Sequence, residues 1–163
     1  MNECVFSPCR TYRYSLVHEW DRALPRVCFL MLNPSVADEQ QLDPTLRRCL
    51  GYARSWHFGS FEIGNVFAFR ATDPRAMKAA TDPFGPANVE HLMRMTRDHV
   101  MVVAAWGVHA THRGGDTVAL RCLPRGKTIH ALALTKSGAP KHPLYLRGDL
   151  RPIRFATERT VAA

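Results

Sequence analysis

The sequence predicts a three-layer α/β/α fold, in which helices cover both faces of a mostly parallel central sheet. Three short apolar runs, at residues 26–32, 61–69 and 100–106, have the length and composition of strands buried on both faces. Segments with helical patterning separate these runs, and strands that alternate with helices form parallel sheets. The 163 residues are the size of one domain, so we expect a single domain with its core at about residues 10–154.

Turn and capping residues mark the elements of the first half of the chain. Residues 12–17 alternate aromatic and polar side chains, which indicates a first strand at an edge of the sheet. Asn33-Pro34 ends the apolar strand that follows. Asp43 and the proline after it have the layout of a helix N-cap with proline in the first turn, which predicts a helix over residues 44–56.

The second half continues the alternation of strands and helices. Residues 61–69 form a strand with Asn65 in its middle, where a polar side chain needs a partner or a function. The remaining expected elements are a helix at residues 85–98, a strand at 100–106, a helix at 108–122 interrupted at Gly114-Gly115, a strand at 128–133 and a frayed tail from residue 157.

The charge balance favours a polyanionic partner. Twenty-two Lys and Arg stand against fourteen Asp and Glu, a formal net charge of +8, although a basic balance can also serve solubility alone. No run reaches the roughly 20 apolar residues of a membrane helix, and the first residues lack a signal-peptide layout. We therefore expect a cytoplasmic protein that does not bind membranes.

Metal and cofactor motifs are incomplete. The five cysteines are scattered without a C-x-x-C pair, which fits a reduced cytoplasmic protein. Cys4 and Cys9 have a spacing that could begin an iron–sulfur site, but no second close pair follows. His109 and His112 lack an evident third metal ligand. We expect no metal and no cofactor.

Three polar residues fall where the carboxyl ends of parallel strands meet. Asn33 follows one strand, Asn65 lies within the next, and His142 lies in the loop after the last. Open α/β sheets bind ligands at this edge. Each residue also has a structural explanation, as a turn former, a partner for neighbouring backbone or an ordinary loop histidine. Their common position favours a functional site.

The order of four motifs resembles that of the uracil-DNA glycosylase-like superfamily. These motifs are Met31-Leu32-Asn33-Pro34-Ser35, Gly64-Asn65-Val66, Val103-Ala104-Ala105-Trp106-Gly107 and His142-Pro143-Leu144-Tyr145-Leu146. More narrowly, NPSVAD, DPTLRRC, NVFAFRATDP, AWG and HPLYL are similar to a domain-of-unknown-function family, some of whose relatives are antiphage DNA glycosylases that remove glucosylated hydroxymethylcytosine.

The resemblance implies roles for the motif residues. Asn33 would orient the attacking water, Asn65 would bind the edge of a flipped base, and His142 would stabilise charge on the departing base. Leu146 would fill the space that the flipped nucleotide leaves. Leu144-Tyr145 stands where the superfamily usually has Ser-Pro, which puts a phosphate contact in doubt.

Further residues are assigned to the site by their position. The expected base-binding set also contains Pro34, Ser35, Arg70 and Asp73, and the expected DNA-binding set contains Lys141, Tyr145, Leu146 and Arg147. Arg70, Thr72 and Asp73 could together line an enlarged pocket that binds a sugar on the base. A solvated loop explains Lys141 and Arg147 equally well. The sequence does not choose which aromatic side chain stacks on the base among Trp56, Phe58 and Phe69.

The chemistry agrees with these roles. Cleavage of an N-glycosidic bond places negative charge on the leaving base, which a donor such as His142 stabilises. Asn33 is not a strong base, but it can orient a water. Without a carboxylate at this position, we expect slow turnover on ordinary bases and better activity on a base that leaves easily.

The complete prediction is a monomeric, monofunctional DNA glycosylase that flips a modified base out of phage DNA and leaves an abasic site. The modified base expected from the resemblance is glucosylated hydroxymethylcytosine, and the setting is antiphage defence. Two alternatives stay open. The chain could be a non-catalytic binder of modified DNA, or a hydrolase of free nucleosides or nucleotides.

Overall fold

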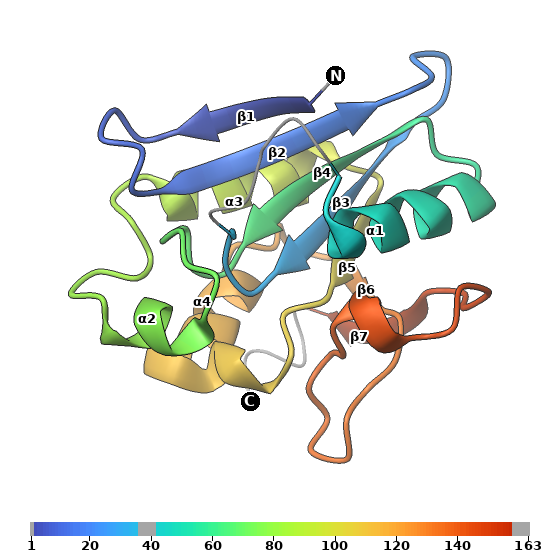
Figure 1. Cartoon of the computed structure of the whole chain (residues 1–163). Coiled ribbons are helices and arrows are strands. Elements are labelled where there is room, and N and C mark those ends of the chain that lie inside the picture. The colour runs from blue at the N-terminus through green and yellow to red at the C-terminus, as the bar shows by residue number, and fades with distance from the viewer. Residues whose placement is uncertain (1, 36–41, 158–163) are drawn as a thin grey trace.

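The computed structural model describes residues 2–35 and 42–157 and has mixed α/β architecture, as the sequence predicts (Figure 1). The strands are β1 (Asn2–Phe6), β2 (Arg13–Glu19), β3 (Arg26–Met31), β4 (Ser60–Asn65), β5 (Met101–Ala104), β6 (Thr128–Ala131) and β7 (Ile153–Thr157). The helices are α1 (Pro44–Ser55), α2 (Pro74–Ala79), α3 (Asn88–Asp98) and α4 (Gly115–Arg121), with the 3-10 helices η1 (Val108–Gly114) and η2 (Pro143–Tyr145). None of the described helices is long and apolar enough to cross a membrane.

The seven strands form one sheet in the order β1-β2-β4-β3-β5-β6-β7. The four central strands, β4, β3, β5 and β6, run parallel to one another. The outer pairings β1–β2, β2–β4 and β6–β7 are antiparallel. The sheet is therefore parallel only at its centre, whereas the sequence predicted a mostly parallel one.

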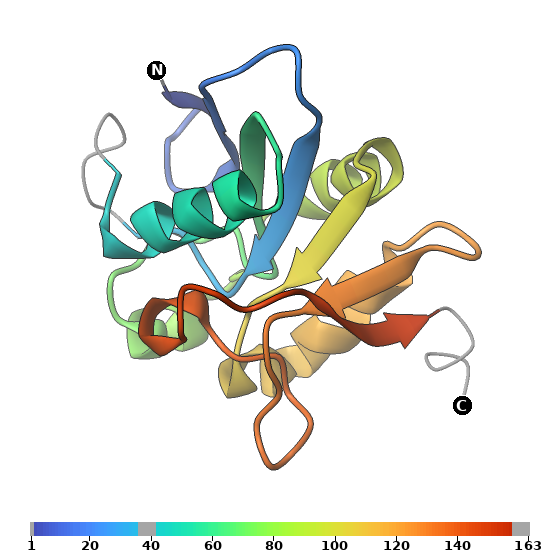
Figure 2. The same ribbon diagram turned by 90° about the vertical axis from the view of Figure 1, so that its right-hand side faces the viewer.

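Side chains of the central strands alternate between two apolar cores, one on each face. In β3, Val27, Phe29 and Met31 pack with α1, whereas Cys28 and Leu30 pack on the opposite core with α3 and α4. Figure 2 shows α1 and α3 on opposite sides of the sheet. Burial on both faces explains why these strands are continuous apolar runs.

The predicted start of α1 is confirmed. Asp43 caps the helix, with its Oδ1 accepting a hydrogen bond from the Leu46 N–H at 2.8 Å, and Pro44 is the first helical residue. The predicted interruption of the helix at residues 108–122 is also present, because η1 and α4 meet at Gly114, whose φ is +67°.

Four elements were not predicted, and several boundaries differ. The strands β1 and β7, the six-residue helix α2 and the 3-10 helix η2 were missed, and β2 is not an edge strand because β1 pairs with it. Asn65 ends β4 rather than lying mid-strand. Beyond Asn65 the chain stays beside the segment that follows β3, with the Val66 and Phe67 N–H groups donating to the carbonyls of Met31 and Leu32.

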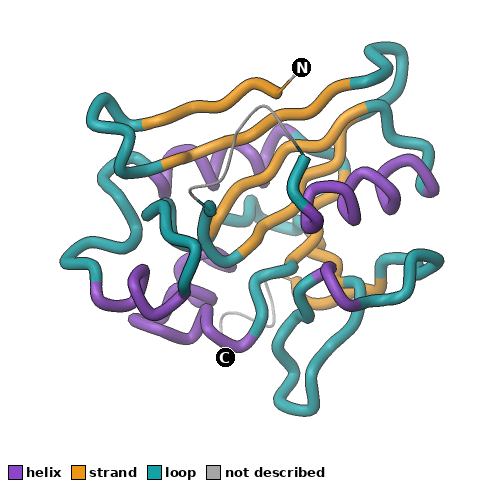
Figure 3. Tube along the Cα trace, in the orientation of Figure 1, coloured by secondary structure: helices purple, strands orange, loops and turns teal. Residues whose placement is uncertain are grey.

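The carboxyl ends of the parallel strands open into loops. Figure 3 shows the long connection between β6 and β7, which contains η2 and a loop that projects from the body. The segments that follow β3, β4 and β5 lie at this same end of the sheet, because the strands are parallel and in register. This arrangement brings residues from distant parts of the sequence together.

Candidate functional site

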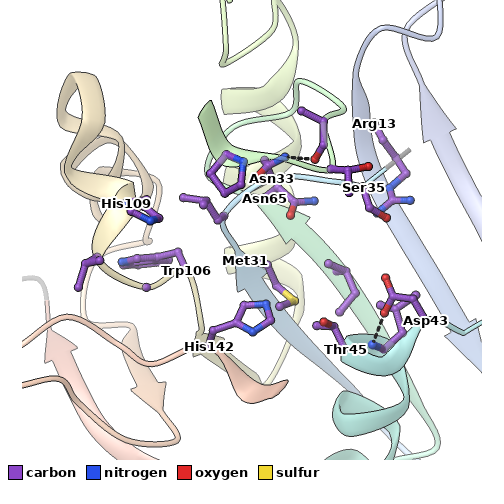
Figure 4. A pocket seen from close by; sticks show the side chains of 18 residues that line it. Arg13, Met31, Asn33, Ser35, Asp43, Thr45, Asn65, Trp106, His109 and His142 are labelled. Atoms are coloured by element: carbon purple, nitrogen blue, oxygen red, sulfur yellow. Dashed lines mark hydrogen bonds between the residues drawn. The ribbon is translucent and has the colours of Figure 1, made fainter. Parts of the chain in front are cut away.

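A cavity of about 420 Å³ lies at the carboxyl ends of β3, β4 and β5. Its volume lies within the range of roughly 300–1,000 Å³ typical of small-molecule sites. The start of α1 and the residue before η2 complete its wall (Figure 4). Of the predicted site residues, Asn33, Ser35, Asn65 and His142 line this cavity.

The amide of Asn33 is held in one orientation by the loop that carries it. Its Nδ2 donates to the carbonyl oxygens of Ala71, at 2.7 Å, and Pro34, at 3.2 Å. Pro34 is buried, and its own carbonyl oxygen also accepts from the Ala71 N–H. With the nitrogen occupied, the Oδ1 atom of Asn33 is an acceptor suited to a water or a ligand hydroxyl.

Asn65 is buried, with 2% of its surface exposed, and lines the cavity. Its backbone carbonyl accepts a hydrogen bond from Asn88 Nδ2 at 3.0 Å. Among residues 2–35 and 42–157, however, no group hydrogen-bonds the side-chain amide of Asn65. Buried amides are nearly always paired, so this amide has the properties of a ligand-binding group, with one acceptor and two donor hydrogens.

His142 lies across the cavity from the two asparagines (Figure 4). Its Nδ1 accepts a hydrogen bond from the Leu144 N–H at 3.4 Å, so the neutral ring carries its hydrogen on Nε2. His142 is exposed on its outer side, but partial desolvation of the ring lowers its pKa, and the negative charge of Asp43 partly offsets this effect. The His142 ring is therefore uncharged at neutral pH and has an Nε2–H donor.

The cavity also contains residues that the sequence did not assign to the site. Trp106, which follows β5, is a flat apolar wall. Arg13, only 6% exposed, brings a fixed positive charge from β2. Asp43, predicted solely as a helix cap, also lines the cavity. The AWG and DPT motifs could have pointed to Trp106 and Asp43, but no sequence pattern marked Arg13.

Three predicted base-binding residues lie outside the cavity lining, namely Pro34, Arg70 and Asp73. Arg70 Nη1 donates to the carbonyl oxygen of Arg10 at 3.0 Å, and its guanidinium lies over the Phe6 ring. Asp73 caps α2 and pairs with Arg75 at 2.8 Å. Thr72, considered together with Arg70 and Asp73, does line the cavity, as do Ala71 and Pro74.

The predicted DNA-binding residues surround His142 along the chain. Lys141 and Arg147 are exposed, and the Arg147 side chain pairs with Asp149. Tyr145 is 91% exposed, whereas Leu146 is partly buried and packs against the core on the α1 face. Tyr145 is therefore more accessible to a partner than Leu146.

None of the three aromatic residues considered for stacking on a base lines the cavity. Trp56 and Phe58 are buried in the core that α1 covers, and Trp56 Nε1 donates to the carbonyl oxygen of Leu150. Phe69 packs against the opposite core. Trp106 is the aromatic side chain that the structure places at the cavity.

The described residues of the lining thus combine hydrogen-bonding amides, two imidazoles of which His142 is a neutral donor, one arginine, one carboxylate and a flat aromatic wall. This set suits a planar heterocycle with several polar edge atoms. Across residues 2–35 and 42–157, no three His, Cys, Asp or Glu side chains converge in a way that could hold a metal ion.

Comparison with known proteins gives a family but no characterised relative. No curated protein and no solved structure matches the chain. A family model described as "Protein of unknown function (DUF1643)" matches residues 13–144, from the first residue of β2 to the middle of η2. The match covers most of the 163 residues and includes all of β3, β4 and the cavity wall between them. The chain belongs to the DUF1643 family.

Proposed function

We propose that this protein is a monofunctional DNA glycosylase with a three-layer, uracil-DNA glycosylase-like fold. The observation that carries the proposal is the buried Asn65 amide, which has no partner among the described residues and faces the same cavity as Asn33 and His142. A flipped nucleobase offers the donors and acceptors that such an amide binds. Trp106 would stack on the base.

The proposed reaction separates base recognition from bond cleavage. Asn65 binds the edge of the base, and the Oδ1 atom of Asn33 orients a water toward the C1′ carbon of the sugar. The bond between C1′ and the base nitrogen breaks, and the base leaves with the electron pair. The Nε2–H of His142 stabilises the negative charge that develops on the base.

DNA is the proposed partner because the surface beside the cavity suits a duplex. The chain has a net charge of +8, and Lys141, Tyr145 and Arg147 are exposed next to His142. Phosphates bind cations, and an exposed aromatic ring can stack on bases. From the sequence resemblance, we propose that the substrate is glucosylated hydroxymethylcytosine in phage DNA and that the protein acts as a cytoplasmic monomer in antiphage defence.

The test uses phage DNAs in which cytosine is unmodified, hydroxymethylated or glucosylated, together with uracil-containing and mismatched duplexes. Released bases are identified by mass spectrometry, and abasic sites are counted. We expect release of one modified base by the wild-type chain and none by Asn33→Ala, with the melting temperature of the variant measured as a control. Tight binding without release from any DNA would favour a non-catalytic binder, and release only from free nucleosides would favour a nucleoside hydrolase.

A further inference from the structure

Asp43 does more in this structure than cap a helix. Its Oδ1 accepts from the Leu46 N–H, which satisfies the capping role. The side chain also lines the cavity, and no described residue hydrogen-bonds its second carboxylate oxygen. One oxygen therefore fixes the carboxylate in place while the other stays available to a ligand.

The second Asp-Pro cap of the chain shows that this placement is not required by capping. Asp73 caps α2 through the Arg75 N–H, as Asp43 caps α1. However, the Asp73 carboxylate forms an ion pair with Arg75 and lies outside the cavity lining. Asp43 thus differs from Asp73 in having no ion-pair partner among the described residues and in facing the cavity.

Asp43 is the only carboxylate among the described residues that line the cavity. Its charge reaches the His142 ring, whose pKa it raises against the larger lowering effect of burial. Figure 4 shows the two side chains on opposite sides of Met31. A negative charge and a neutral imidazole donor thus share one cavity.

Hydrolysis needs a group that takes the proton of the attacking water. The Asn33 amide cannot take it, because an amide is not basic at neutral pH. His142 is also committed, because its Nδ1 accepts from the Leu144 N–H and its Nε2 carries hydrogen. The second imidazole of the lining, His109, has its Nδ1 3.2 Å from Lys78 Nζ. Among the described residues of the lining, the carboxylate of Asp43 is the basic group that remains.

We propose that Asp43 is the general base of the glycosylase reaction, a role that rests on the proposed function. The water oriented by Asn33 gives its proton to the free carboxylate oxygen of Asp43 while its oxygen bonds to C1′. The bond between C1′ and the base breaks, the base leaves with the electron pair, and it later takes a proton from solvent. The negative carboxylate also stabilises the positive charge that builds on the sugar.

Asp43→Asn separates the two roles, because asparagine caps a helix as well as aspartate does but cannot accept the proton. We expect the single-turnover rate of base release to fall by about 10²–10⁴-fold, the usual contribution of a general base. The melting temperature and the affinity for substrate DNA should stay close to those of the wild type. Asp82→Asn is the matched control, since Asp82 is exposed, accepts from the Phe84 and Gly85 N–H groups and does not line the cavity.

Asp43→Gly provides a second readout, because glycine is also tolerated at an N-cap and leaves room for an added carboxylate. We expect formate, but not chloride at the same ionic strength, to restore part of the rate. A wild-type rate in Asp43→Asn would overturn the proposal, and so would a loss in both variants that formate does not relieve. If the wild-type chain releases no base from any DNA, the glycosylase function itself is wrong, and the role of Asp43 is rejected with it.

Discussion

Two buried asparagines, 23 positions apart, differ in the hydrogen bonding of their side chains. Asn88 is fully buried and donates from Nδ2 to the carbonyl oxygens of Asn65 and Val66, both at 3.0 Å. Asn65 is nearly as buried, but its amide has no hydrogen-bond partner among the described residues and faces a cavity. Leaving a buried amide unpaired costs stability. Asn88 therefore serves the fold, and Asn65 is suited to serve a ligand.

Substitution by alanine separates these two roles. We expect Asn65→Ala to change the free energy of unfolding by less than about 1 kcal/mol, because no hydrogen bond of the side chain within the protein is lost. Base release should fall by about 10–100-fold, the equivalent of two hydrogen bonds to the base. Asn88→Ala should destabilise the fold by about 2 kcal/mol or more. Urea denaturation and the excision assay measure both effects, and a destabilisation of Asn65→Ala equal to that of Asn88→Ala would contradict this division.

His142 gives a test that does not depend on catalysis. Burial lowers the pKa of its ring below the ordinary value of about 6.5, and the Asp43 charge opposes this effect. We therefore expect NMR titration to give a pKa for His142 below the ordinary histidine value. In Asp43→Asn, the pKa of His142 should be lower still. An unchanged His142 pKa in that variant would mean that the two side chains do not interact in the cavity.

At the scale of elements, η2 connects the cavity to the outer surface. His142 precedes it, Tyr145 ends it with 91% of its surface exposed, and Leu146 follows it and packs against the core. The resemblance implies that Leu146 fills the space left by the flipped nucleotide, as a wedge in the duplex. Leu146 would have to give up its packing against the core to enter DNA. Tyr145 is already exposed, so its insertion would not break contacts within the protein.

We expect Tyr145→Ala to weaken binding to duplex DNA about 5-fold or more, because one stacking contact contributes about 1–3 kcal/mol. Leu146→Ala should mainly lower the melting temperature, since it removes partly buried apolar contacts. Tyr145→Phe should keep the affinity. Fluorescence anisotropy measures the DNA affinity of each variant, and a thermal melt measures its stability. Weaker DNA binding by Leu146→Ala together with wild-type binding by Tyr145→Ala would identify Leu146 as the wedge instead.

Elements with strong local signals were predictable from the sequence. The strand β3 is a continuous apolar run, and α1 begins at an Asp-Pro cap, so both were placed within about one residue of their observed bounds. The helix α2 has only six residues, too few to show a periodicity. The strands β1 and β7 pair at the periphery, where burial is incomplete and the apolar pattern is weak.

The site was predictable in part for a similar reason. Parallel strands bring their carboxyl ends to one edge, so the order of strands and loops along the sequence was enough to place Asn33, Asn65 and His142 together. Arg13 could not be placed in this way, because it reaches the cavity from an antiparallel strand whose position in the sheet depends on the pairing of β2 with β4. Side-chain directions, as for Arg70, also depend on contacts that local sequence does not specify.

At the scale of the whole molecule, a charged cluster lies away from the cavity, within the sheet and beside α3. Glu62 of β4, only 1% exposed, accepts from Ser15 Oγ at 2.7 Å, contacts His99 Nε2 at 3.1 Å and pairs with Arg94. Burial alone would raise the pKa of Glu62, but the hydrogen bonds from His99, Arg94 and Ser15 outweigh it and lower the pKa to about 2. The cluster links β2, β4 and α3.

This cluster should make the stability of the fold depend on pH in one defined window. A carboxyl whose pKa is lower in the folded than in the unfolded chain stabilises the fold above its unfolded pKa, and this contribution is lost as the pH falls through the folded pKa. For Glu62, the contribution is complete above about pH 4.5 and disappears toward about pH 2. A shift of that size corresponds to roughly 3 kcal/mol.

Glu62→Gln should therefore lower the free energy of unfolding by roughly 3 kcal/mol at pH 7, because the glutamine keeps the shape but leaves Arg94 beside an uncharged partner. The difference from the wild type should shrink as the pH is lowered from 5 to 3, because the Glu62 carboxyl of the unfolded chain takes up a proton in this range while the folded chain resists protonation. Urea denaturation at pH 7, 5, 4 and 3 measures the free energy of unfolding of both proteins.

Glu90→Gln is the control, at an exposed position in the first turn of the same helix as Arg94. Its free energy of unfolding should stay within about 0.5 kcal/mol of the wild type. A difference for Glu62→Gln that stays constant over this range would show that the cluster stabilises the fold by packing rather than by charge.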